Sequence, residues 1–131
     1  MTQNINHQLR EILERHGAIR LAVLFGSLAK GTFHHDSDLD IAVCAARPLD
    51  VQEKISLIEE LAEAIGRPVD LVDLSTVGEP LLGQILFGGR RILGDDASYA
   101  DLVLKHLYNQ ADFVPYQKRI LQQRRAAWIG V

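Results

Sequence analysis

Apolar and polar positions follow a helical period at the start of the chain and then change to short apolar runs. The apolar positions of the first segment recur three and four residues apart: Ile5, Leu9, Ile12 and Leu13. This spacing predicts an amphipathic helix that Gly17 can end. Residues 18–25 are dense in aliphatic side chains and predict a buried strand that ends at Gly26, and residues 40–45 predict a second strand.

The next helical segment begins with a capping pair. Asp50 and Glu53 match a capping box, in which each side chain accepts a hydrogen bond from the backbone of the other residue. The apolar positions expected to face inward are Val51, Ile55, Ile58, Ala62 and Ile65. Gly66 closes this helix, and the run at 69–74 predicts a third strand.

A second capping pair, Thr76 and Glu79, predicts another helix with Pro80 at an early position. Its inward residues are expected to be Leu81, Leu82, Ile85 and Leu86. The two glycines at 88–89 stop this helix, and residues 90–93 predict a short edge strand. Together with the earlier segments, this order predicts a small mixed sheet flanked by helices, of the α/β (α+β) class, in one domain over 1–131.

A final helical stretch opens at Ser98 and Asp101 and predicts a tail over about residues 98–128. Pro115 must break or kink this tail, because proline has no N–H for the carbonyl four residues earlier. Its apolar series is Tyr99, Leu102, Val103, His106, Leu107, Phe113, Tyr116, Ile120 and Trp128. Such a stripe fits either a core face or a docking surface for a partner, and the sequence leaves both open.

Composition and charge narrow the class of protein. With 131 residues, 47% of them apolar and 24% charged, the chain has the make-up of a soluble globular domain. The sequence has no apolar run near the roughly 20 residues that span a bilayer and no secretory signal pattern, so we expect a cytoplasmic protein without a membrane partner. Cys44 is the only cysteine, which excludes an internal disulfide and a Cys-rich zinc site. The net charge of −3 argues against strong, charge-driven binding to nucleic acid.

Candidate chemistry is concentrated between the first two predicted strands. Ten residues separate Ser27, in a Gly-Ser turn, from Asp38, and Asp40 follows at a spacing that puts both carboxylates on one face of a strand. Two carboxylates beside an anion-binding turn can hold divalent metal against a nucleoside triphosphate. Taken alone, an Asp-x-Asp pair is also typical of a turn followed by an exposed strand residue.

A third carboxylate would have to come from the neighbouring strand, where Asp70 and Asp73 are available. These two residues lie three positions apart, so on a regular strand they point to opposite faces and only one can join the site.

The sequence Gly26-Ser27, ten further residues and then Asp38-x-Asp40 resembles the signature of the polymerase-beta-like nucleotidyltransferases. The resemblance implies the fold of that family, with Asp38 and Asp40 as ligands of Mg²⁺, two ions in all. It also implies that Asp70 completes the site and takes the proton of the attacking hydroxyl, while Asp73 is a strand-end or helix-capping residue. The implied contacts to ATP, the substrate, come from Gly26, Ser27 and Lys30.

Over nearly its whole length the chain is similar to the minimal nucleotidyltransferases of that superfamily. Some relatives of this kind act as antitoxins, moving AMP from ATP onto a tyrosine of a partner toxin with a HEPN domain. The resemblance therefore implies a HEPN-toxin partner for this chain. Two other functions remain open from the sequence: a nucleotidyltransferase that modifies a small molecule, and a non-catalytic antitoxin that blocks its partner sterically.

Overall fold

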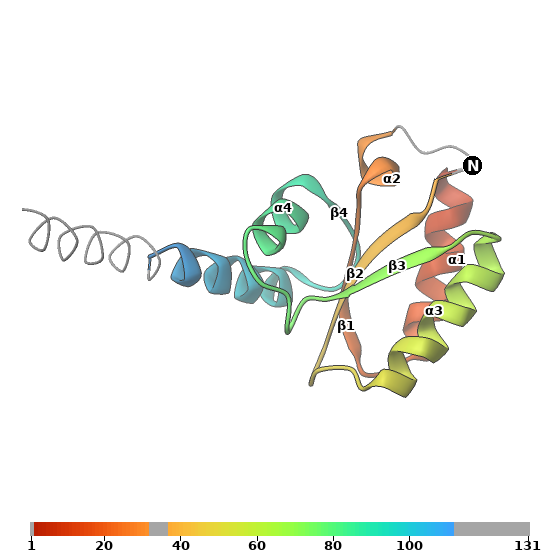
Figure 1. Ribbon diagram of the computed structural model, residues 1–131, viewed down its shortest axis with the longest axis horizontal. Helices are drawn as coiled ribbons and strands as arrows, with labels where there is room; N and C mark the ends of the chain where they lie inside the picture. The colour runs from red at the N-terminus through yellow and green to blue at the C-terminus, as the bar shows by residue number, and fades with distance from the viewer. Residues whose placement is uncertain (1, 32–36, 112–131) are drawn as a thin grey trace, which may run out of the picture.

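A computed structural model of the protein describes residues 2–31 and 37–111 (Figure 1). Its elements in chain order are α1 (Thr2–Arg15), β1 (Ile19–Phe25), α2 (Ser27–Lys30), β2 (Leu39–Ala45), α3 (Val51–Ile65), β3 (Val69–Asp73), α4 (Leu81–Gly88) and β4 (Arg90–Leu93). A further helix, here called helix 96–111, covers the last described residues. No helix in these two ranges is long and apolar enough to span a membrane.

The four strands form one mixed sheet in the order β3-β2-β1-β4. β1 pairs antiparallel with β2 and with β4, whereas β2 and β3 run parallel. The predicted edge strand at 90–93 therefore exists and lies at the edge of the sheet. The mixed sheet confirms the α+β class expected from the sequence.

Helices cover both faces of the sheet (Figure 1). On one face, α1 and α3 pack over a core that includes Leu9, Leu13, Leu57 and Leu61. On the other face, α4 and helix 96–111 enclose a second cluster, which includes Leu82, Ile85 and Leu102. Side chains alternate along β1 and β2 between the two clusters, as the period of a strand requires.

The start and end of α3 are as predicted, but its inward face is not. The amide of Glu53 donates to Asp50 Oδ1 at 2.8 Å and the amide of Asp50 donates to Glu53 Oε1 at 3.2 Å, while Gly66 closes the helix at a φ of 70°. Val51 is 70% exposed and Ile55 is 44% exposed, so placing these two residues inward was wrong. Leu57 and Leu61 are buried instead, because α3 carries two adjacent apolar stripes and the sheet accepts the one with the leucines.

The predicted capping box at Thr76 and Glu79 is also wrong. α4 begins at Leu81 after Pro80, with no side-chain hydrogen bond at the cap. The hydroxyl of Thr76 donates to the carbonyl of Asp73 at 3.4 Å, and the carboxylate of Glu79 lies 2.8 Å from His106 Nδ1 on helix 96–111. Thr76 is thus used in the turn after β3, and Glu79 binds partners on a later helix, which the local pattern does not contain.

The last helix starts two residues earlier than expected and is capped by another residue. Asp95 Oδ1 accepts a hydrogen bond from the amide of Ser98 at 2.8 Å. Of the apolar series in the tail, Tyr99, Leu102 and Val103 pack into the core beside α4, whereas Leu107 is 53% exposed. His106, another member of the series, contacts Glu79 as described above. The other members lie outside the described residues, and so does Pro115; these members are Phe113, Tyr116, Ile120 and Trp128.

Candidate active site

Two of the candidate carboxylates are direct neighbours in the sheet. Asp40 of β2 is in register with Asp70 of β3 in the parallel pair. Ala42 of β2 and Val72 of β3, each two residues further along, pack into the cluster under α4. Asp40 and Asp70 therefore lie on that same face of the sheet, at the end where β2 and β3 begin.

Asp38 lies just before β2 and completes a group of acidic residues around Asp40. Burial raises the pKa of Asp40 above the ordinary aspartate value, and the charges of Asp70 and Asp38 raise it further. The three carboxylates thus repel one another, and a divalent cation would relieve this repulsion. Carboxylate oxygens are also the ligands that Mg²⁺ prefers, so the donor set fits that ion.

In the described ranges, 2–31 and 37–111, no three His, Cys, Asp or Glu side chains are arranged so that they could hold a metal ion. Asp38 and Asp70 are exposed, and their side chains are not confined by packing. The assignment of Asp38, Asp40 and Asp70 as ligands therefore stays a prediction supported by backbone register and electrostatics.

The Gly-Ser turn touches the carboxylate group directly. Gly26 has a φ of +68°, a left-handed conformation, and a Cβ on it would lie 2.1 Å from Asp40 Oδ2. The cause is the register of β1 and β2, in which Phe25 pairs with Asp40. The motif predicts that this glycine lets the backbone approach phosphate, and the structure shows an additional role: Gly26 leaves room for Asp40.

Ser27 and Lys30 form the single turn of α2 that follows. The amide of Lys30 donates to the carbonyl of Gly26 at 3.2 Å, which closes this turn. α2 packs beside β1 and β2, so Ser27 begins its helix next to the acidic group. Lys30 is exposed at the other end of α2.

Asp73 is separate from the acidic group, as its position on the strand predicts. Its side chain is 6% exposed and accepts hydrogen bonds from the amide of Leu49 at 3.0 Å, the amide of Ser75 at 2.9 Å and the hydroxyl of Ser75 at 2.6 Å. Burial by itself would raise the pKa of Asp73, but these hydrogen bonds outweigh it and the pKa is lowered. The interpretation of Asp73 as a strand-end residue is therefore confirmed.

Comparison with known proteins identifies the fold and the family. Residues 7–98 match the family model of the polymerase beta nucleotidyltransferases, which is more than half of the chain. The chain belongs to this nucleotidyltransferase family. It is 37% identical over 100 residues to the protein adenylyltransferase MntA of Shewanella oneidensis, a match that covers 74% of this chain and 72% of the relative.

Solved structures with the same fold come from toxin–antitoxin complexes. One, a toxin–antitoxin with AMP-PNP, aligns with a TM-score of 0.78 at 30% identity, over 92% of this chain and 98% of that one. Another is a tri-AMPylated Shewanella oneidensis HEPN toxin in complex with the MNT antitoxin. It aligns with a TM-score of 0.76 at 27% identity, over 96% of this chain and all of that one.

Within this nucleotidyltransferase, one residue near the acidic group is not predictable from the motif. Arg67 Nη1 donates to the carbonyl of Ser37 at 3.5 Å, and the amide of Leu39 donates to the carbonyl of Pro68 at 2.9 Å. The segment after α3 thus holds the backbone on both sides of Asp38. Only the parallel pairing of β2 with β3 brings Arg67 there, and the sequence contains no local signal for that pairing.

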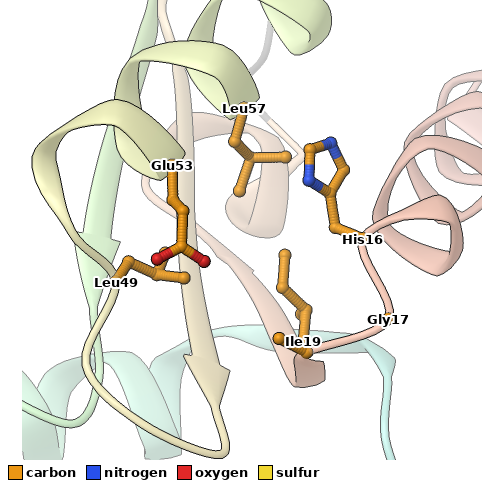
Figure 2. Close-up of a pocket in the computed structure, with 7 residues that line it drawn as sticks. His16, Gly17, Ile19, Leu49, Glu53 and Leu57 are labelled. Carbon is orange, nitrogen blue, oxygen red and sulfur yellow. The ribbon is translucent and has the colours of Figure 1, made fainter.

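A cavity of about 170 Å³ on the opposite face of the nucleotidyltransferase is not the active site (Figure 2). It lies between the end of α1 and the start of α3, with Ile19, Leu49 and Leu57 forming its apolar wall. Its two polar side chains already have partners, since His16 lies 3.0 Å from Glu60 and Glu53 lies 2.7 Å from Arg47.

Proposed function

We propose that the protein is an antitoxin that transfers AMP from ATP to a tyrosine of a partner HEPN toxin. The observation that carries this proposal is the register of Asp40 with Asp70 beside the Gly26 turn, in a chain of the nucleotidyltransferase family. The adenylyltransferase relative and the AMPylated HEPN toxin bound to a similar antitoxin support the acceptor and the partner. Since the substrate is ATP, we also propose that the protein works in the cytoplasm.

Each carboxylate of the site has a role in such a transfer. In the reaction, a tyrosine oxygen bonds to the α-phosphorus of ATP, the bond to pyrophosphate breaks and the tyrosine proton leaves. We propose that Asp70, which is exposed and in register with Asp40, accepts this proton, and that Asp38 and Asp40 bind Mg²⁺ together with Asp70. Two Mg²⁺ ions would activate the attacking hydroxyl and neutralise the departing pyrophosphate.

The turn that follows β1 would receive the triphosphate. Backbone N–H groups at Gly26 and Ser27 can donate to phosphate oxygens, and the Ser27 hydroxyl can add a further bond. Lys30, exposed at the end of α2, would contribute a positive charge near the same phosphates. With a net charge of −3, the chain must collect positive charge locally to hold ATP.

The test is the intact mass of the protein encoded by the neighbouring gene, the expected HEPN partner, after incubation with the full chain, ATP and Mg²⁺. We expect a gain of one or more AMP units with the natural sequence, and none with Asp38→Asn or Asp40→Asn. Asp96→Asn is the matched control, because Asp96 is an exposed carboxylate far along the chain from the acidic group, and it should keep full transfer.

The alternative functions give different results in the same experiment. An unchanged mass together with a tight complex would replace the proposal by steric neutralisation. An unchanged mass without a complex, with AMP transfer to an added small hydroxyl compound, would show a small-molecule nucleotidyltransferase instead. Full transfer by Asp38→Asn or Asp40→Asn would show that the metal site is assigned to the wrong residues.

A further inference from the structure

A second cavity, of about 320 Å³, opens on the same face of the sheet as Asp40 but at the other end. It lies between the start of β1, the end of β2 and helix 96–111. Cys44, which lines it, is four residues along β2 from Asp40, a separation of about 13 Å at the rise of a strand. The volume is in the range of small-molecule sites, and the distance separates it from the nucleotidyl-transfer chemistry.

The lining combines an apolar floor with a charged rim. Leu21 and Leu102 are both buried and form the floor together with Cys44. Arg20 from β1 and Lys105 from helix 96–111 contribute positive charges, and Asp101 contributes one negative charge. A ligand with an apolar body and an anionic end would match this lining.

In the described ranges no ion pair within 4.0 Å is found for either Arg20 or Lys105, so neither cation is neutralised by a neighbouring carboxylate there. By comparison, Arg47 lies 2.7 Å from Glu53 and Arg91 lies 2.7 Å from Asp96. Lys105 Nζ donates to the carbonyl of Ser75 at 3.1 Å, which orients the ammonium group and leaves its other N–H groups for a ligand.

Arg20 and Lys105 line the same cavity as the thiol of Cys44, and the charge of each acts on that thiol. Burial raises the pKa of Cys44 and the charge of Asp73 adds to this rise, while Lys105 and Arg20 each lower it. Asp73 itself is held by hydrogen bonds from Leu49 and Ser75. The cations therefore remain as the groups available to an anion that enters.

We propose that this cavity binds a small organic phosphate, with the phosphate between Arg20 and Lys105 and the apolar body against Leu21 and Leu102. A guanidinium from β1 and an ammonium from helix 96–111 suit a phosphate monoester, since both donate charge-assisted hydrogen bonds. The site goes beyond AMP transfer and does not depend on it. Asp101 opposes the anion, so removing its charge should strengthen binding.

The test uses the full chain and phenyl phosphate as the probe. Affinity is measured by calorimetry without Mg²⁺, and position by the rate at which iodoacetamide alkylates Cys44, the only cysteine of the chain. We expect saturable binding and at least a threefold slower alkylation with phenyl phosphate, but not with phenol. Arg20→Gln and Lys105→Gln should each weaken binding by about tenfold, as expected for loss of one charge-assisted bond. Asp101→Asn should strengthen binding.

Two control variants distinguish this cavity from anion binding elsewhere on the protein. Arg10→Gln removes a cation from α1, on the far side of the sheet, and should leave the affinity unchanged. Lys30→Gln removes the cation beside the proposed ATP site and should also leave it unchanged. Weaker binding in Lys30→Gln with unchanged binding in the rim variants would overturn the proposal, as would absent binding or equal protection by phenol.

Discussion

At the scale of single residues, the contact between Gly26 and Asp40 couples the turn to the carboxylate group. A methyl group on residue 26 would lie 2.1 Å from Asp40 Oδ2, and the φ of +68° already disfavours any side chain. We therefore expect Gly26→Ala to displace Asp40 and to reduce AMP transfer by at least about 100-fold, on the scale of an ångström misplacement at a reacting centre. The intact-mass assay as a time course measures this loss.

Gly31→Ala is the matched control for that variant. Gly31 has a φ of +75°, so alanine causes similar backbone strain there, but no atom of residues 2–31 or 37–111 is found within 4 Å of the added Cβ. We expect a comparable loss of stability in thermal unfolding and little loss of transfer. Equal losses of transfer in the two variants would show that backbone strain, and not the position of Asp40, is the cause.

Substitution of Asp70 should affect activity, whereas substitution of Asp73 should affect stability. Asp70→Asn is expected to abolish transfer without lowering the melting temperature, since Asp70 is exposed and its charge repels that of Asp40. Asp73→Asn is expected to keep transfer but to cost about 2 kcal/mol of unfolding free energy, because it weakens buried hydrogen bonds to a charged acceptor. Urea unfolding and the mass assay measure the two effects, and the reverse pattern would show that the catalytic carboxylate is Asp73.

The lowered pKa of Asp73 also sets the direction of a pH effect. A carboxyl whose pKa is lower in the folded state stabilises the protein above its unfolded pKa, and this contribution is lost as the pH falls through the folded value. The difference between the natural sequence and Asp73→Asn should therefore be largest at neutral pH and shrink in acid.

Asp40 should behave in the opposite way in metal-free protein. Its pKa is raised in the folded state, first by burial and then by Asp70 and Asp38, so its ionised form lowers stability at neutral pH. Asp40→Asn should raise the unfolding free energy at pH 7 by less than about 1 kcal/mol, because solvent screens this partly exposed group. The gain should vanish below the ordinary aspartate pKa. A loss of stability at pH 7 in urea unfolding would contradict this.

The residues of the site were accessible from sequence to different degrees. Asp38, Asp40 and the Gly-Ser turn form a motif of fixed spacing, and the separation of Asp70 from Asp73 followed from strand alternation, which the structure bears out by placing Asp73 with Leu49 and Ser75. The closeness of Gly26 to Asp40 was not accessible, because it depends on the register between β1 and β2.

At the scale of elements, the seam between α4 and helix 96–111 was the part least predictable from the sequence. Glu79 accepts from the amide of Gly83 at 3.4 Å and from the side-chain amide of Asn109 at 3.3 Å, besides its contact with His106. The ring of Phe87 meets the His106 ring edge-on, with centroids 5.4 Å apart. A local capping pattern cannot reveal partners that lie on a later helix of the chain, so Glu79 was assigned to the wrong role.

This seam depends on the absence of a side chain at Gly83. A Cβ there would lie 2.5 Å from Cε1 of His106. Because His106 is held by Glu79 and Phe87, we expect Gly83→Ala to destabilise the protein by about 1–3 kcal/mol, the range for overpacking. Gly88 lies in the same helix, and no atom of the described part of the chain is found within 4 Å of a Cβ added there, so Gly88→Ala should be neutral or slightly stabilising. Urea unfolding measures the change in unfolding free energy of the two variants. Equal changes would show that His106 moves aside at no cost.

At the scale of the whole molecule, the acidic group and the larger core cluster lie on opposite faces of the sheet. The acidic group lies where β2 and β3 begin, on the face covered by α4 and helix 96–111, while α1 and α3 fill the other face with the larger core cluster (Figure 1). The order of the strands and of the longer helices was predictable from periodicity and glycine positions, whereas the short helix α2 and the strand pairings were not. Which apolar stripe of α3 faces the sheet was not, because Val51 and Ile55 are as apolar as the leucines that are buried.

The group of three carboxylates also predicts how binding of a nucleotide and Mg²⁺ changes the stability of the whole protein. Because the three carboxylates repel one another, a nucleotide should bind well only together with Mg²⁺. AMP-PNP with Mg²⁺, at 100 times its dissociation constant, should add about 2.7 kcal/mol to the unfolding free energy by mass action. The added stability should appear as a higher melting temperature, which EDTA should bring back to the value without ligand. In Asp38→Asn, AMP-PNP with Mg²⁺ should not raise the melting temperature, whereas in Asp96→Asn it should raise it as much as in the natural sequence. Equal stabilisation by AMP-PNP in EDTA would mean that the nucleotide is held by the Gly26 turn and Lys30 alone, and that the carboxylates serve another purpose.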